Sequence, residues 1–162
     1  MACPWFLPQQ PMPQSHTGPA PRTPLGELWN GLCCASGNQA EVSHEACNSG
    51  YARSRCSHFP AESPHDAVRF HVAGENGDLI RLQYIYEREW WPGEHGVLEY
   101  SRARGEVAPE NGNGLLGRQA AAFAESWIRR TTLHGNAHDG RGPRPVSGFQ
   151  RRRRRVLCAP EH

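Results

Sequence analysis

Residues 67–86, AVRFHVAGENGDLIRLQYIY, decide the fold because their apolar side chains recur at every second position. The alternation covers residues 68–72 and resumes in residues 80–86. A period of two is typical of β-strands that bury one face. Between the two runs, Asn76-Gly77 tolerates the positive φ angles of a type I′ turn. The stretch therefore predicts an antiparallel β-hairpin.

Two segments that follow the hairpin predict the rest of the fold. Residues 95–101, HGVLEYS, indicate a third strand, reached through a turn around Pro92-Gly93. Residues 115–128 predict a helix with one apolar stripe, formed by Leu116, Ala120, Phe123, Ala124 and Trp127. Because a sheet with one apolar face needs a cover, the expected class is α+β: a small antiparallel sheet of three or more strands packed by a C-terminal helix.

The segment before the hairpin carries most of the cysteines and predicts a helical N-terminal part. Thr23-Pro24 is a typical helix start, and the apolar residues at positions 25, 28, 29 and 32 share one helical face. A second, short helix is expected between Ser43, as its cap, and Gly50.

Both ends of the chain differ from this body in composition. Residues 1–22 contain six prolines and predict a disordered arm. Residues 133–162 are rich in arginine and predict a disordered basic tail. A single α+β domain is therefore expected over residues 23–132. The N-terminus lacks the pattern of a signal peptide and no apolar run reaches membrane-spanning length, so we expect a cytoplasmic protein without a membrane partner.

A group of sulfur and imidazole side chains lies within residues 33–58. Thiolates and imidazoles are the soft ligands that bind zinc, and thiolates hold iron–sulfur clusters. The paired C-x2-C knuckles of most zinc sites are absent. The candidate metal ligands are Cys33, Cys34, Cys47, Cys56, His44 and His58.

Two other interpretations of the cysteines stay open at this point. Free cysteine often serves as a small buried hydrophobic residue. A thiol-redox protein or sensor could instead use Cys47 and Cys56, because Arg53, Arg55 and His58 would favour the thiolate of Cys56. In every interpretation, Cys3 and Cys158 fall in the expected disordered ends and receive no role.

The stretches LWNGLCC (28–34) and ACNSGYARSRCSHFP (46–60), with DAVRF (66–70) and HGVLEY (95–100), resemble a group of small uncharacterised bacterial proteins. Their most specific element is C-N-x-G-Y-A-R-x-x-C-x-x-F-P. The resemblance implies a bacterial source but no established activity. It also implies that the defining positions are Cys47, Asn48, Gly50, Tyr51, Arg53, Cys56, Phe59 and Pro60.

Two further segments are candidates for binding surfaces. Trp90-Trp91 would be a binding patch if exposed, although we expect one ring in the core and the other over the sheet edge. The arginine run is a candidate for weak, non-specific nucleic-acid binding, through Arg151, Arg152, Arg153, Arg154 and Arg155. Phosphate-binding loops, a GxSxG elbow and an HExxH helix are absent from the sequence, which favours a non-enzymatic protein.

Overall fold

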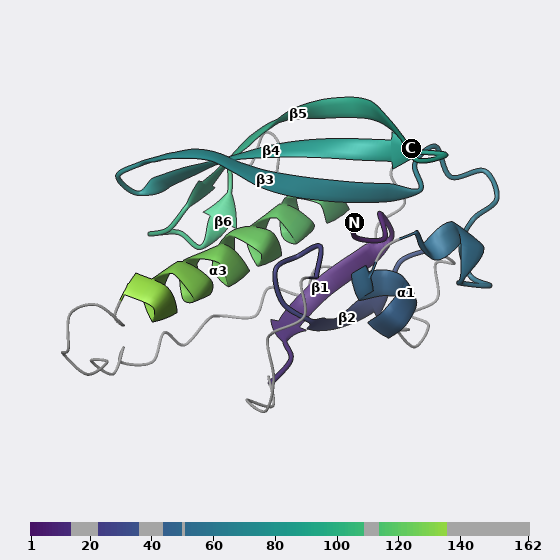
Figure 1. Ribbon diagram of the computed structural model, residues 1–162, viewed down its shortest axis with the longest axis horizontal. Coiled ribbons are helices and arrows are strands. Elements are labelled where there is room, and N and C mark those ends of the chain that lie inside the picture. The colour runs from purple at the N-terminus through teal and green to yellow at the C-terminus, as the bar shows by residue number, and fades with distance from the viewer. Residues whose placement is uncertain (14–22, 36–43, 50, 109–113, 136–162) are drawn as a thin grey trace.

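The computed structural model describes residues 1–13, 23–35, 44–49, 51–108 and 114–135. One helix, α3 (Leu115–Gly135), crosses one face of a four-stranded antiparallel sheet (Figure 1). The strands follow the order β3-β4-β5-β6, with β3 (Ala67–Asn76), β4 (Leu79–Arg88), β5 (Trp91–Ser101) and β6 (Glu106–Val107). The predicted α+β class, with an antiparallel sheet packed by a C-terminal helix, is confirmed.

The main core lies between this sheet and α3. Ile80 and Leu82 of β4 are fully buried, and Phe70 of β3 stacks against Phe123 of α3 with ring centroids 5.7 Å apart. The predicted apolar stripe is confirmed, because all of its members belong to the core or pack against it, namely Leu116, Ala120, Phe123, Ala124 and Trp127.

The β3–β4 hairpin is confirmed, but its turn lies one residue later than predicted. Asn76 is still paired, so the two loop residues are Gly77 and Asp78. Gly77 has a φ of 57°, while Asp78 is not among the residues with positive φ. Positive φ at the first loop position alone is typical of a type II′ turn rather than type I′. A bulge between Val72 and Gly74 adds a residue to β3 and shifts the register.

The turn between β4 and β5 lies at Glu89-Trp90, earlier than the predicted turn near Pro92. Both loop residues have positive φ, 51° and 71°, although neither is glycine. Such a conformation costs roughly 1–3 kcal/mol per residue. Contacts outside the hairpin stabilise it. The amide of Glu89 donates a hydrogen bond of 2.6 Å to Asp66. The ring of Trp90 stacks on that of Tyr51 at a centroid distance of 3.5 Å.

A second, two-stranded sheet pairs β1 (Phe6–Pro11) with β2 (Trp29–Cys33) in antiparallel register. It lies on the side of α3 opposite the four-stranded sheet, so the helix is the middle of three layers (Figure 1). The short helix α1 (His44–Ser49) lies beside β2. Cys33 and Cys47 are therefore carried by the layer that α3 separates from the main sheet.

The prediction that residues 1–22 form a disordered arm is wrong for residues 1–13. Phe6 and Leu7 are fully buried, and β1 packs against α3. The prolines of β1 are tolerated because the strand has a single neighbour and a bulge follows Pro8. The core thus includes residues that precede the expected start of the domain, while the rest of the expected arm lies outside the described residues.

The expected helical N-terminal part is replaced largely by strand. Gly26 has a φ of 84°, which interrupts any helix ahead of β2. The side chain of Asn48 then stabilises extended backbone, because it accepts from the N–H of Trp29 and donates to its carbonyl oxygen, both at 3.0 Å. Among the described N-terminal residues, helical structure is limited to α1 and the single 3-10 turn η1 (Ala52–Ser54).

Candidate metal centre

Cys3 lies in a tight turn just before β1 and is only 4% exposed. Its amide donates to the carbonyl oxygen of Cys47 at 3.2 Å. Its own carbonyl accepts from the amide of Phe6 at 3.1 Å and from Nε2 of Gln119 at 2.8 Å. Nε2 of Gln119 also donates to the carbonyl of Phe6 at 2.6 Å. The turn that presents Cys3 is therefore held by α1 on one side and α3 on the other.

Two more buried cysteines come from the elements next to this turn. Cys33 is the last residue of β2 and pairs in register with Phe6 of β1. Cys47 lies in α1 and packs in the same core cluster as Cys3. Strand pairing and the hydrogen bond between the Cys3 amide and the Cys47 carbonyl thus bring three thiols from three separate segments together.

Cys56 is the fourth free cysteine and follows the η1 turn. Its amide donates to the carbonyl of Ala52 at 2.7 Å, and its own carbonyl accepts from the amide of Phe59 at 3.2 Å. The residue is half-buried and packs against the cluster that contains Cys3 and Cys47. It is therefore the most accessible of the four thiols.

The four free thiols are electrostatic neighbours. A hydrogen bond with the Cys47 side chain, burial and the proximity of Cys47 and Cys33 raise the pKa of Cys3 far above its ordinary value. Burial, together with Cys47 and Cys56 nearby, raises the pKa of Cys33. A negative charge on one thiolate disfavours a second negative charge on a neighbouring thiol. Because their pKa values are raised, Cys3 and Cys33 are protonated at neutral pH in the metal-free protein.

The spacing of these side chains sets a condition on metal binding. Among the described residues, no group of three or more His, Cys, Asp or Glu side chains is placed so that it could hold a metal ion. A zinc ion needs sulfur atoms about 2.3 Å away, and an iron–sulfur cluster spreads its thiolate ligands over several iron atoms. Binding of any metal at these cysteines would therefore require the thiols to leave their present positions.

The structure separates the candidate ligands predicted from sequence. It places Cys33, Cys47 and Cys56 together, whereas Cys34 is disulfide-bonded and is not one of the free thiols. His58 is exposed to solvent. His44 begins α1, but its side chain lies outside the described residues, as does the whole arginine run of residues 151–155.

Sequence reasoning missed Cys3, which joins the other three free thiols. The only local signal is the apolar run Trp5-Phe6-Leu7, which is shorter than the four to eight residues typical of a buried strand and lies between two prolines. The nearby prolines instead suggested disorder. Because Cys3 is buried in the core, the candidate ligands in the structure are the four free cysteines, Cys3, Cys33, Cys47 and Cys56.

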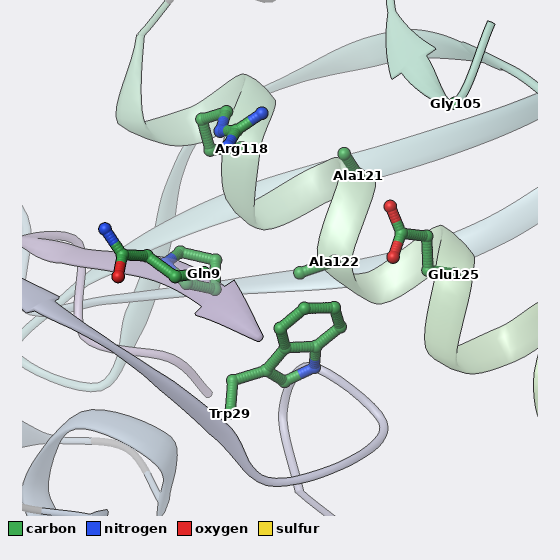
Figure 2. Close-up of a pocket in the computed structure, with 8 residues that line it drawn as sticks. Gln9, Trp29, Gly105, Arg118, Ala121, Ala122 and Glu125 are labelled. Atoms are coloured by element: carbon green, nitrogen blue, oxygen red, sulfur yellow. The ribbon is translucent and has the colours of Figure 1, made fainter. Parts of the chain in front are cut away.

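A small pocket lies elsewhere, between the two-stranded sheet and α3 (Figure 2). Its lining includes Gln9, Trp29, Arg118 and Glu125, and its volume is about 30 Å³. Because about 10–15 Å³ of such space is enough to hold one water molecule, the pocket has room for only a few waters. It is therefore too small to be a substrate site.

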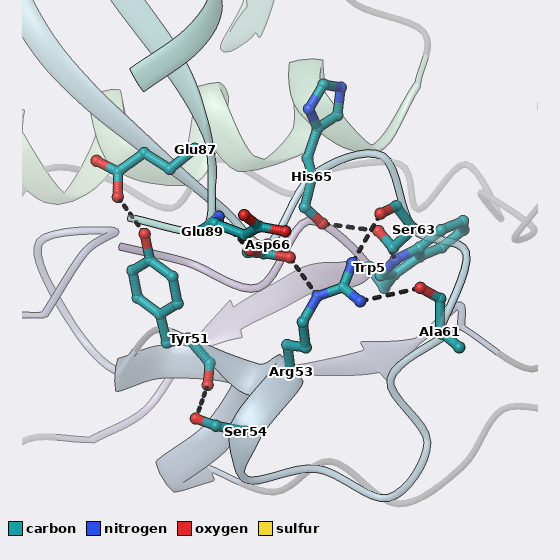
Figure 3. Close-up of polar contacts among 10 residues, drawn as sticks. All are labelled: Trp5, Tyr51, Arg53, Ser54, Ala61, Ser63, His65, Asp66, Glu87 and Glu89. Atoms are coloured by element: carbon teal, nitrogen blue, oxygen red, sulfur yellow. Dashed lines mark hydrogen bonds and ion pairs between the residues drawn. The ribbon is translucent and has the colours of Figure 1, made fainter. Parts of the chain in front are cut away.

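A network of polar contacts fixes the loop that carries Cys56 (Figure 3). Nε of Arg53 pairs with the buried carboxylate of Asp66. Burial raises the pKa of Asp66, but the hydrogen bond from the Glu89 amide and the Arg53 guanidinium together hold it below its usual range. The hydroxyl of Tyr51 donates to the buried carboxylate of Glu87 at 2.7 Å. These contacts tie the loop to the end of β4.

The tryptophan pair at the β4–β5 turn does not enter the core. Trp90 is 68% exposed and Trp91 is 76% exposed, which corrects the expectation that one of them would be buried. The stacking of Trp90 on Tyr51 explains the difference, because one ring face is covered without burial of the whole side chain.

Thiol accessibility gives a first prediction. In chelator-treated, reduced protein, we expect iodoacetamide to modify Cys56 at least about tenfold faster than Cys3, because a buried, protonated thiol must wait for local opening. Peptide mapping by mass spectrometry at successive times measures both rates. Denatured protein is the control, in which the two cysteines should react alike. Equal rates in the native protein would contradict the described burial.

No helix among the described residues has the length and apolarity needed to cross a membrane. Comparison of the chain with family models, with curated proteins and with solved structures finds no match in any of the three. The resemblance described above therefore stays a prediction.

Proposed function

We propose that this protein is a non-enzymatic metal-binding protein whose centre is ligated by the thiolates of Cys3, Cys33, Cys47 and Cys56. The observation that carries the proposal is that four free cysteines come from four separate segments to one region: Cys3 and Cys47 share the core cluster, Cys56 packs against it, and Cys33 is an electrostatic neighbour of the other three. Four thiolates are the ligand set of structural zinc sites and of common iron–sulfur clusters.

The position of the four cysteines suggests what the centre does. One cysteine precedes β1, one ends β2, one lies in α1 and one follows η1. A metal bound by all four would cross-link the layer that α3 separates from the main sheet. Because the unfolded chain has no preformed site, the binding free energy would add directly to the stability of this layer.

An iron–sulfur cluster is the favoured occupant, and a single zinc ion is the alternative. The cysteines are separated along the chain by 29, 13 and 8 intervening residues, without the paired knuckles typical of zinc. A cluster also accepts ligands that lie farther apart than those around one ion. Both occupants need the same four thiolates, so the experiment below distinguishes them.

Thiol-redox chemistry is supported less well by the site. The raised pKa values of Cys3 and Cys33 keep these thiols protonated, and a protonated thiol is a poor nucleophile. A metal ion reverses this situation, because a coordinated thiol loses its proton outright. The hydrogen-bonded pair in the structure is Cys3 with Cys47, so a redox protein would use that pair rather than Cys47 with Cys56.

Anaerobic purification followed by elemental analysis and an absorption spectrum tests the proposal. For a cluster we expect about two or about four iron per chain, with an equal amount of sulfide and with visible absorption; for zinc, we expect about one ion and no colour. Removal of either by a chelator should lower the melting temperature. A metal-free protein that takes up neither metal on reconstitution would overturn the proposal. A Cys3–Cys47 disulfide formed on mild oxidation of such a protein would favour the redox alternative.

A further inference from the structure

Residues with an unusual backbone conformation meet at the end of the β4–β5 hairpin. In the part of the chain that the structure describes, the residues other than glycine with positive φ are Tyr51, Glu89 and Trp90. The rings of Tyr51 and Trp90 stack at a centroid distance of 3.5 Å, and Glu89 directly precedes Trp90. Strained residues of this kind cluster at ligand-binding sites, where the surrounding structure holds them in place. This end of the sheet is therefore a candidate binding surface.

Tyr51 supports one face of the Trp90 ring and is itself fixed in place. Its ring is buried, and its hydroxyl donates to the fully buried carboxylate of Glu87 at 2.7 Å (Figure 3). The guanidinium group of Arg69 pairs with the same carboxylate. Trp90 is still 68% exposed, so the ring face that is not stacked on Tyr51 is open to solvent. Trp90 is thus a flat apolar platform whose position is set before any ligand binds.

This platform adjoins the outer face of the four-stranded sheet, which is the face opposite α3. Of the elements that the structure describes, α1, α3 and the two-stranded sheet all lie on the other side (Figure 1). Two rows of paired residues follow the platform on the outer face, first Arg69, Ile85 and His95, then His71, Gln83 and Val97. All of these side chains except Ile85 are exposed. The platform and the two rows form one continuous surface, because Arg69 contacts Glu87 next to Tyr51.

The charges of this surface favour a neutral ligand. The charge of Arg69 is balanced by that of Glu87, and Arg81, farther along the sheet, lies opposite Glu99 in register. The other polar groups of the two rows are two imidazoles and the amide of Gln83, which offer both hydrogen-bond donors and acceptors. A nucleic acid would instead need a surplus of cations that neutralise its phosphates. The surface therefore suits a ligand that is uncharged and rich in hydroxyl groups.

We propose that this surface binds a neutral oligosaccharide, with one sugar ring stacked on the open face of Trp90. One side of a pyranose ring presents C–H groups, whose partial positive charge suits the negative face of an aromatic ring. Its hydroxyl groups donate and accept hydrogen bonds, as the side chains of His95, His71 and Gln83 do. Further sugar units would lie over the two rows beside the platform. No cysteine takes part, so this binding does not depend on the metal centre proposed above.

The test compares Trp90→Ala with Trp91→Ala in the full chain. Cellohexaose, chitohexaose and maltohexaose are the probes, and calorimetric titration up to millimolar concentration measures their binding. The two tryptophans are matched, because they are adjacent and are 68% and 76% exposed. Pro92 is in register with Glu87, so Trp91, one residue earlier, points away from the face that carries Glu87.

We expect at least one of the three probes to bind the wild-type chain. Trp90→Ala should weaken that binding by about thirtyfold or more, the effect of removing a central aromatic anchor. Trp91→Ala should bind like the wild type. Circular dichroism shows whether each variant is folded. If Trp90→Ala does not fold, Trp90→Gly takes its place, because glycine adopts the positive φ of this turn without strain and also removes the ring.

Four results would overturn the proposal. The first two are no binding of any probe by the wild-type chain and an equal loss of binding in the two tryptophan variants. The third is binding of single-stranded oligothymidylate in place of the saccharides, lost in Trp90→Ala, which would identify a nucleic-acid surface. The fourth is a wild-type dimer that becomes a monomer in Trp90→Ala, which sedimentation would detect and which would assign the platform to a second copy of the chain.

Discussion

A Cys3→Ser variant is expected to lose the metal that we propose the wild-type protein binds. Cys3 is buried, and its thiol is hydrogen-bonded to that of Cys47, so no neighbouring group can take its place as a ligand without moving the turn. Loss of a direct ligand should reduce affinity by more than the roughly 10–100-fold that loss of an outer-shell partner costs. Competition with a chelator of known affinity measures the change.

Cys34→Ser is the matched control for this experiment. Cys34 is adjacent to Cys33 and is an equally good candidate from sequence, but it is not one of the free thiols. We expect Cys34→Ser to retain the wild-type metal content. Retention of metal by Cys3→Ser, with loss from Cys34→Ser, would instead restore the ligand set that the sequence suggested and remove the turn at Cys3 from the site.

The elements that sequence predicted well are those that depend on local pattern. The β3–β4 hairpin follows from alternation over a few residues and a glycine at the turn. The buried face of α3 follows from the 3.6-residue period of its alanines and aromatic residues. In both cases a segment of ten or more residues repeats one pattern, so tertiary contacts only reinforce the local preference.

The elements that sequence predicted wrongly depend on contacts between distant segments. β1 is short and contains prolines, and it is a strand only because β2 pairs with it and α3 covers it. β2 has apolar residues at helical spacing, but Asn48 and β1 satisfy its backbone in extended form. Cys3 and Cys33 lie in or beside these strands. The pairing of β1 with β2 and the packing of α3 on β1 therefore also decide which cysteines lie close together.

Gly31→Ala should be the most damaging single substitution in this layer. Gly31 of β2 pairs with Pro8 of β1. A Cβ at this position would lie 2.1 Å from the carbonyl oxygen of Leu7 and 2.6 Å from the ring of Phe6. The first of these contacts is with backbone, which cannot move aside by a change of rotamer. The two strands would have to separate, at a cost of about 2–3 kcal/mol or more in the free energy of unfolding.

Gly74→Ala in β3 is the control, because a Cβ added there would have no atom within 4 Å and the φ of Gly74 is not positive. It should leave the free energy of unfolding unchanged or raise it by up to about 1 kcal/mol, through a smaller entropy of the unfolded chain. Urea denaturation of both variants, metal-free and loaded, measures these effects.

The loaded form of Gly31→Ala carries a further consequence. Separation of β1 from β2 would move Cys3 away from Cys33, since the register of Phe6 with Cys33 is what places them together. The variant should therefore lose metal affinity as well as stability, while Gly74→Ala keeps both. A Gly31→Ala protein that is destabilised but binds metal like the wild type would mean that the strand pairing does not position the ligands, and that α1 and the loop of Cys56 suffice.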